Sequence, residues 1–244
     1  MTAGLPGSPA IERLDLFSIP VWRSPVPEFD PYAEAMRGWV LGEWERGAFA
    51  KHAHGYGYQS PATLFSRQSL ARNPGLGILK KAFADRAFAA LRQRTNHFVH
   101  LPPEAYAFMA WVLVQTNESW VNNAWHDHAP ALISGCYYLQ IPECDDPLEG
   151  ALAFMRPSLA DGFTRQIQVV EPRQGEFVLF PSALTHRPQP TPTATGLRIS
   201  VNMDCYVRWA HWDEETGPAD PQAYKRRLEQ TLDPDAEPPP SVGD

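Results

Sequence analysis

The chain has 244 residues, 43% of them hydrophobic, and a formal net charge of −7. This length suffices for one well-buried domain with peripheral helices, and no run approaches the roughly 18 apolar residues of a membrane span. Nine acidic and three basic residues from 213 to 244 carry −6 of the charge, which leaves −1 for residues 1–212. There is no basic stripe, so we expect neither a nucleic acid nor a membrane as partner.

The compartment is inferred from the cysteines and from the start of the chain. The first residues lack the basic region and apolar core of a signal peptide. The three cysteines, Cys136, Cys144 and Cys205, are odd in number and not closely paired. This argues against a disulfide framework and fits a reducing compartment, so we expect a cytoplasmic protein. Cys136 alternates with apolar residues and is expected to be a small core residue.

The first hundred residues predict one strand and two helices. Residues 1–10 contain two Pro and two Gly and are expected to be disordered. Residues 14–22 alternate loosely and predict a strand, which Pro20 would confine to a sheet edge. Asp30 and Asn73 each precede a proline and predict helix N-caps. The first helix has apolar residues at helical spacing, and the second is expected to run to about residue 95. The apolar positions of the first helix are Tyr32, Met36, Trp39, Val40 and Trp44.

From residue 106 the pattern becomes that of short strands separated by Pro and Gly. Their spacing predicts a barrel or a sandwich, so the fold class is mainly β with peripheral helices. The expected strands are 107–114, 119–128, 132–141, 151–155, 166–171, 176–180, 185–189 and 197–207. We expect a single domain over 11–212, with a strand and helices in 11–104 and a barrel core in 105–208. An acidic, Pro-rich C-terminal extension follows at 213–244, with a short helix near 221–232 and a disordered end at 234–244.

The most informative stretch is a His-x-His pair. His126 and His128 share a face if the segment is a strand, whereas Asp127 points the other way. A third histidine, His186, follows 60 residues after His126. Arg198 comes twelve residues later, with Ser200 on the same strand face. A metal held by histidines, with an arginine deeper in the barrel for a carboxylate, favours the chemistry of a non-haem iron oxygenase.

Five motifs in this order resemble the 2-oxoglutarate/Fe(II)-dependent oxygenase superfamily from about residue 14 to 206, and within it a 2OG-Fe(II) oxygenase family with a His-x-His motif. The five are Ser119-Trp120-Val121-Asn122, His126-Asp127-His128-Ala129, Ser134-Gly135-Cys136-Tyr137-Tyr138-Leu139, Phe180-Pro181-Ser182-Ala183-Leu184-Thr185-His186 and Arg198-Ile199-Ser200-Val201-Asn202. The resemblance implies a double-stranded β-helix (jelly-roll, cupin-like) core. It also implies Fe(II), 2-oxoglutarate and O₂, and hydroxylase-type oxidation of an organic substrate with release of succinate and CO₂.

Two departures from the family pattern stand out. The superfamily usually has His-x-Asp or His-x-Glu, whereas position 128 is His; and Asn202 stands two residues after Ser200 instead of four. Three ligand sets are therefore open. In the first, His126, His128 and His186 form the complete metal face. Asp127 could instead be the carboxylate ligand, or His126 and His186 could bind alone with a halide or water.

The resemblance also implies a cosubstrate site. Arg198 would clamp the distal carboxylate of 2-oxoglutarate through its bidentate fork, and Ser200 would donate from the same face. Tyr138 could donate its phenol to the same carboxylate, because its strand resembles that of the prolyl-hydroxylase branch. The alternatives are that Arg198 pairs with a surface acid and that Tyr138 is a core aromatic. Tyr137 points the other way and is expected to pack.

The sequence also allows a second candidate metal site and two other classes of function. A second His-x-His, His52 and His54, lies in a Gly-punctuated loop and is expected to bind no metal. A three-histidine cupin dioxygenase would use O₂ without 2-oxoglutarate, and a non-catalytic barrel would bind a small molecule. Trp120, Trp125 and Tyr58 favour an organic substrate with apolar or aromatic surface. The sequence leaves the oligomeric state open, a homodimer being one alternative.

Overall fold

The computed structural model of the chain describes residues 12–16, 19–51, 57–94, 102–117, 125–155, 167–208, 212–213 and 217–218. Several predictions lie outside these residues. They concern the termini at 1–10 and 221–244, the second histidine pair (His52 and His54) and Trp120. The domain limits at 11, 104 and 212 also stay predictions.

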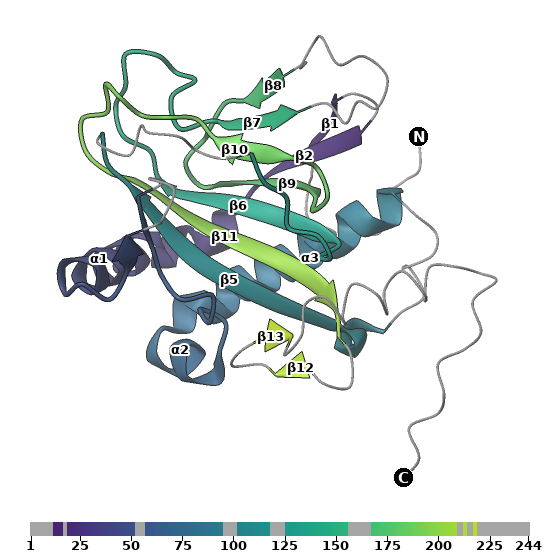
Figure 1. The fold of residues 1–244 in the computed structure, drawn as a ribbon. Coiled ribbons are helices and arrows are strands. Elements are labelled where there is room, and N and C mark those ends of the chain that lie inside the picture. The colour runs from purple at the N-terminus through teal and green to yellow at the C-terminus, as the bar shows by residue number, and fades with distance from the viewer. Residues whose placement is uncertain are drawn as a thin grey trace.

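Two antiparallel sheets form the body of the molecule (Figure 1). An eight-stranded sheet has the order β1-β2-β9-β6-β11-β5-β4-β3, and a three-stranded sheet has the order β10-β7-β8. The larger sheet contains β1 (Glu12–Leu16), β2 (Ile19–Pro25), β3 (Ala50–Lys51), β4 (Tyr58–Gln59), β5 (Tyr106–Gln115), β6 (Ile133–Gln140), β9 (Glu176–Pro181) and β11 (Arg198–Val207). The smaller contains β7 (Leu152–Met155), β8 (Ile167–Val170) and β10 (His186–Pro188), and β12 (Trp212–Asp213) pairs with β13 (Gly217–Pro218). The predicted mainly β architecture is confirmed.

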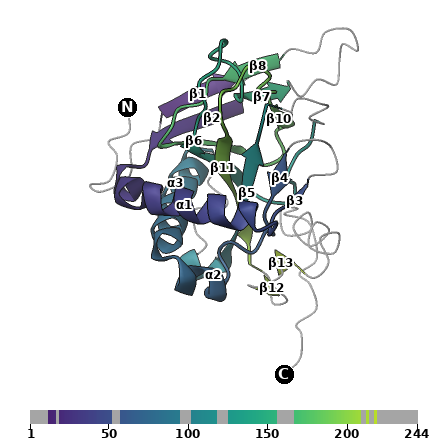
Figure 2. The same cartoon turned by 90° about the vertical axis from the view of Figure 1, so that its left-hand side faces the viewer.

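Helices cover one face of the large sheet (Figure 2). They are α1 (Asp30–Glu45), α2 (Arg67–Arg72) and α3 (Pro74–Arg94), with short 3₁₀ helices η1 (Pro27–Phe29) and η2 (Pro103–Ala105). Met36 and Val40 of α1 are buried, as their spacing predicted, although Tyr32 is exposed. Among the described residues, no helix is both long and apolar enough to cross a membrane.

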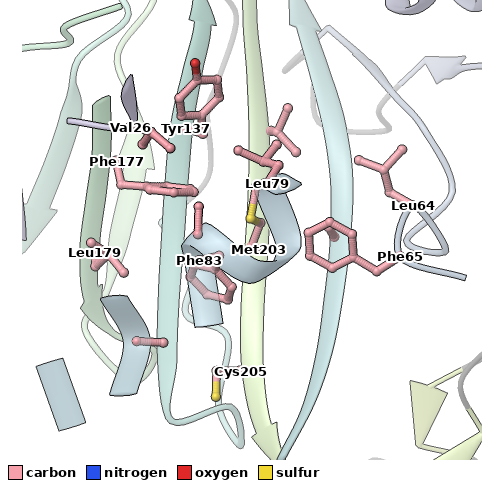
Figure 3. Packing of buried hydrophobic residues seen from close by; sticks show 14 of the residues in the cluster. Val26, Leu64, Phe65, Leu79, Phe83, Tyr137, Phe177, Leu179, Met203 and Cys205 are labelled. Atoms are coloured by element: carbon pink, nitrogen blue, oxygen red, sulfur yellow. The ribbon is translucent and has the colours of Figure 1, made fainter. Parts of the chain in front are cut away.

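Strand alternation divides the interior into two cores. On β6, Ile133 and Tyr137 face the helices, whereas Cys136 and Tyr138 face the smaller sheet. On the helix side, the ring of Phe83 from α3 packs between the sheet and the helix layer, 5.9 Å from the ring of Phe177 (Figure 3). Cys136 and Tyr137 therefore lie as the sequence predicted.

The N-terminal strand differs from its prediction. Residues 14–22 do not form one strand but the β1–β2 hairpin, in which Leu16 pairs with Ile19. Pro20 was expected to mark an edge, yet β2 lies between β1 and β9. The pairing of β2 with β9 begins only at Trp22, so Pro20 has no ladder partner on that side and its missing N–H costs nothing there.

The helix starts were also only partly predicted. Asn73 caps α3 as expected, since its Oδ1 accepts a hydrogen bond from the backbone N–H of Gly75 at 3.1 Å. Asp30 is the first residue of α1 instead of its cap, because η1 leads directly into the helix. The short helix α2 was missed. Its signal was Ser66, whose hydroxyl accepts from the N–H of Ser69 at 3.2 Å.

Candidate metal centre

Three imidazoles converge at one end of the space between the sheets. His126, His128 and His186 each offer a ring nitrogen, and these nitrogens all lie within 4.8 Å of one another. The ring centroids of His126 and His186 are 4.5 Å apart, and those of His128 and His186 are 4.9 Å apart. This separation is that of ligands around a single metal ion.

Backbone hydrogen bonds place the pair His126 and His128. His126 forms an isolated antiparallel bridge with His186, whose N–H donates to the His126 carbonyl at 2.9 Å. The N–H of His128 instead donates to the carbonyl of Ser182, in the turn after β9, at 2.8 Å. The predicted strand at 119–128 is therefore wrong over its described part, residues 125–128. The chain leaves the ladder after one bridge, because its next partner is a turn.

The alternation expected of that segment nevertheless holds for its side chains. Asp127 is exposed, and its Oδ1 accepts from the N–H of Ala129 at 3.1 Å. It lies outside the three-histidine group. The geometry thus separates Asp127 from the imidazoles and gives no support to the alternative in which its carboxylate completes the metal face.

Hydrogen bonds to Nδ1 determine how two of the rings are oriented. The Nδ1 of His186 lies 2.9 Å from the carbonyl oxygen of Leu184, which can only accept. The Nδ1 of His128 lies 2.9 and 3.1 Å from the two carboxylate oxygens of Asp204. Both Nδ1 atoms are therefore the protonated donors, and each Nε2 keeps a lone pair for a metal.

Asp204 is a residue of this candidate site that sequence reasoning missed. It is 3% exposed and also accepts a hydrogen bond from Ser134 at 2.6 Å. A signal was present: Asp204 stands six residues after Arg198 in the same strand, so alternation puts both on one face. An acid inside an otherwise apolar strand needs a partner. The sequence did not show that the partner is His128.

Burial and neighbouring charge shift the pKa values of these rings in opposite directions. Burial lowers the pKa of His128, but the charge and the hydrogen bond of Asp204 outweigh it, so the value lies above the ordinary one. Burial and the two neighbouring imidazoles hold the pKa of His186 well below its ordinary value. His186 is therefore neutral, and able to bind a metal, at physiological pH.

Arg198 starts β11 and is 2% exposed. Its Nε donates to the carbonyl of Gly150 at 2.8 Å, and its Nη1 donates to Gln115 Oε1 at 2.7 Å and to Ser200 Oγ at 3.0 Å. Every acceptor that the described residues offer it is neutral. The alternative of a surface acid as partner is therefore not observed, and the buried cation can accommodate an anionic ligand.

Tyr138 and Gln115 leave polar atoms unpartnered beside Arg198. The guanidinium lies over the Tyr138 ring, 5.0 Å from its centroid. Within the described part of the chain, the Tyr138 hydroxyl and Gln115 Nε2 are buried without hydrogen-bond partners. Burial raises the pKa of Tyr138 well above its ordinary value, so the hydroxyl remains a donor. Tyr138 is thus a buried aromatic, as one alternative held, that also keeps a free donor near the arginine.

One pocket of about 190 Å³ connects the imidazoles with Arg198. Its lining residues are Gln59, Trp111, Leu113, His126, His128, Leu152, His186, Pro188, Arg198 and Asn202. Trp111 lines the pocket, whereas the expected Trp125 and Tyr58 do not, and the ring centroid of Trp111 lies 5.3 Å from that of His128. Tyr58 packs on Trp44 instead, and Arg187 lies over Trp125. Sequence reasoning chose these two because it could not tell which faces turn inward.

The fold and the imidazole cluster define a class: a double-stranded β-helix with a candidate metal site of three histidines. The family model described as "Putative 2OG-Fe(II) oxygenase" matches residues 109–204, from β5 into β11. The resemblance inferred from the motifs is thereby confirmed over this segment. Fe(II) and 2-oxoglutarate are the cofactors of that family, as predicted. None of the curated protein sequences compared with the chain matches it.

Solved structures confirm the double-stranded β-helix. The non-haem alpha-ketoglutarate-dependent carbocyclase SnoK from nogalamycin biosynthesis is 13% identical, with a TM-score of 0.53 over 76% of this chain and 78% of that one. AviO1 from Streptomyces viridochromogenes Tue57 is 14% identical, with a TM-score of 0.53 over 87% and 94%. HygX from Streptomyces hygroscopicus, solved with nickel, 2-oxoglutarate and hygromycin B, is 16% identical, with a TM-score of 0.51 over 79% and 85%.

Proposed function

We propose that this protein is a 2-oxoglutarate- and Fe(II)-dependent oxygenase, a non-haem dioxygenase that oxidises an organic substrate and releases succinate and CO₂. One observation carries the proposal: three converging imidazoles and a buried, acid-free arginine line the same pocket. A metal alone would explain the imidazoles. The arginine calls for an anion in addition, and a carboxylate that reaches from the metal to Arg198 meets both requirements.

The proposed metal ligands are His126, His128 and His186. Imidazole nitrogens suit Fe(II), and three ligands on one face leave coordination positions for other molecules. The Nδ1 of His186 donates to the carbonyl of Leu184, and the Nδ1 of His128 donates to Asp204. These hydrogen bonds orient both rings and leave each Nε2 available for the metal. The residues present therefore fit the ion.

The proposed role of Arg198 is to bind the distal carboxylate of 2-oxoglutarate. Gly150 and Gln115 hold the guanidinium in place through their oxygens, and Ser200 accepts from Nη1. The unpartnered Tyr138 hydroxyl and Gln115 amide are further donors, which a carboxylate could satisfy. The cosubstrate-binding residues proposed here are thus Arg198, Ser200 and Tyr138, with Gln115 as a support.

When bound, the iron with 2-oxoglutarate and O₂ supplies the oxidising chemistry. The chain supplies position and exclusion of water. Leu113, Leu152 and Trp111 give the pocket apolar walls, whereas Gln59 and Asn202 offer amide groups for orienting a substrate. We infer a small organic substrate, for which hygromycin B in HygX is a precedent in this fold. We further infer a cytoplasmic enzyme that does not act on nucleic acid.

The proposal is tested by succinate formation. Purified protein is loaded anaerobically with Fe(II), mixed with 2-oxoglutarate and air-saturated buffer, and analysed for succinate with and without candidate substrates. We expect slow, iron-dependent succinate release that His186→Ala abolishes and Asp127→Asn keeps. Oxygen consumption without any need for 2-oxoglutarate would favour the three-histidine cupin dioxygenase. Failure to bind iron would favour a non-catalytic binding barrel.

A further inference from the structure

We propose that Asp204 is a positioning residue for the metal. It orients His128 and places a negative charge behind that imidazole, where a carboxylate ligand would otherwise bring the charge directly. The inference rests on the proposed function, since it concerns the same ion. It adds that this site, which has a histidine at position 128, still contains a carboxylate, that of Asp204, on the far side of the His128 ring from the other two imidazoles.

Asp204 contacts His128 through both of its carboxylate oxygens. Both carboxylate oxygens lie within hydrogen-bond distance of Nδ1, at 2.9 and 3.1 Å. A carboxylate that faces a ring nitrogen in this way can only accept, so the proton is on Nδ1. The opposite nitrogen, Nε2, then points its lone pair away from Asp204 and toward the other two imidazoles.

A chain of hydroxyl groups holds the carboxylate in place. Ser134 Oγ lies 2.6 Å from Asp204 Oδ1 and 3.0 Å from Ser182 Oγ. Ser134 has one hydroxyl proton, which the shorter contact takes, so Ser182 donates to Ser134. The carbonyl of Ser182 accepts the backbone N–H of His128. Ring and backbone of His128 are thus fixed by the same group of residues.

All described partners of Asp204 are neutral donors or His128. The hydroxyl of Tyr206 donates to Oδ2 at 3.3 Å, and the described residues show no lysine or arginine paired with this carboxylate. A buried carboxylate without a fixed cation is costly. A divalent ion held by the imidazoles would offset that cost through the ring of His128.

The comparison with His186 shows what Asp204 adds. The Nδ1 of His186 also donates, but to a neutral carbonyl, that of Leu184. If the only task were to orient the ring, a neutral carbonyl would serve His128 as well as it serves His186. Three neutral imidazoles plus Asp204 carry one negative charge, which is the charge of two histidines and a carboxylate ligand. A carboxylate behind an imidazole also increases the basicity of the ring as a ligand.

The main test is a double-mutant cycle on metal affinity. Fe(II) and Ni(II) dissociation constants are measured anaerobically by calorimetry for wild type, Asp204→Asn, His128→Asp and the double variant. Loss of a carboxylate behind a ligand weakens metal binding by about 10–100-fold, which we expect for Asp204→Asn in wild type. In the His128→Asp background, the same change should cost about threefold or less, because the ring through which Asp204 acts is gone.

Asp127→Asn is the matched control. It removes one carboxylate charge from a residue adjacent to His128, but Asp127 is exposed and does not contact the ring. We expect a change of about threefold or less in metal affinity. Equal losses for Asp127→Asn and Asp204→Asn would show a general charge effect and overturn the proposal.

A second readout needs no metal. Imidazole ¹⁵N NMR at alkaline pH reports which ring nitrogen carries the proton, with His128 assigned through His128→Asp. We expect the Nδ1–H form for His128 in the wild type and a mixture of tautomers in Asp204→Asn. Wild type that shows the Nε2–H form would overturn the inference even if Asp204→Asn did not fold.

Absence of metal binding in wild type would overturn the proposed function, whereas a metal affinity unchanged by Asp204→Asn would overturn this inference alone.

Discussion

The carbonyl oxygen of Gly150 accepts a hydrogen bond from Nε of Arg198 at 2.8 Å, and a Cβ added to Gly150 would lie 2.8 Å from Cδ of the same arginine. Gly150 has φ of +69°, a conformation that residues with a side chain rarely adopt. The positive φ and the close approach of Arg198 thus both favour glycine at this position. The loop before β7 therefore determines where the guanidinium stands.

Gly150→Ala is expected to weaken 2-oxoglutarate binding while metal affinity stays unchanged. The added methyl group would displace Arg198, and overpacking of this kind costs about 1–3 kcal/mol. A loss of 1.4 kcal/mol in binding corresponds to about tenfold in the dissociation constant. Calorimetry of 2-oxoglutarate with Ni(II)-loaded protein measures it. Gly47→Ala is the control, since Gly47 has φ of +73° but nothing within 4 Å of an added Cβ.

Replacement of Arg198 should separate cosubstrate binding from metal binding. Arg198→Met keeps much of the length and removes the charge, and loss of a buried hydrogen-bonded charge costs about 2–5 kcal/mol. We expect the dissociation constant of 2-oxoglutarate to rise at least about thirtyfold. Arg198→Lys should recover only part of this, because Lys lacks the planar fork. Metal affinity that falls together with 2-oxoglutarate affinity would contradict separate sites.

Asp127 and His128 should respond oppositely to substitution. Asp127→Asn should keep iron and most of the activity, whereas His128→Ala should lose much of both. His128→Asp restores the His-x-Asp spacing, so we expect it to keep iron with reduced turnover. Iron content after anaerobic desalting and the rate of succinate release measure both. An inactive Asp127→Asn with an active His128→Ala would show that Asp127 is the ligand after all.

The packing of α3 on the sheet predicts the cost of Gly135→Ala. A Cβ at Gly135 would lie 2.7 Å from Cε2 of Phe83, inside the helix-side core. We expect a loss of about 1–3 kcal/mol in stability, because Phe83 would have to move within a packed layer. At this chain length, each kcal/mol lowers the melting temperature by about 2–4 °C. Gly38→Ala, in α1 with nothing near an added Cβ, should instead stabilise the protein by up to about 1 kcal/mol. Thermal denaturation of the two variants distinguishes them.

The sequence predicted features that follow from local periodicity. Alternation correctly put Cys136 and Tyr137 on opposite faces of β6, and it brought His126 and His128 to one side although the segment is no regular strand. The same rule placed Arg198 inward. These predictions held because side-chain direction in extended chain depends only on neighbouring residues.

Features that depend on strand pairing could not be predicted. Asp204 contacts His128 across 76 residues, and Gln115 contacts Arg198 across 83. Both contacts depend on β5 and β6 flanking β11 in a particular register, which a single sequence does not reveal. The break of the first strand into β1 and β2 has the same origin, since a hairpin and a continuous strand share their alternation.

The central claim is most directly tested by anaerobic binding of 2-oxoglutarate to protein with and without metal. In calorimetry we predict one Fe(II) per chain in wild type and one 2-oxoglutarate, bound tightly only when the metal is present. His126→Ala and His186→Ala should lose the metal and, with it, the tight binding of 2-oxoglutarate. Stoichiometric iron in either purified variant, or 2-oxoglutarate bound equally well without metal, would contradict a cosubstrate held between the three imidazoles and Arg198.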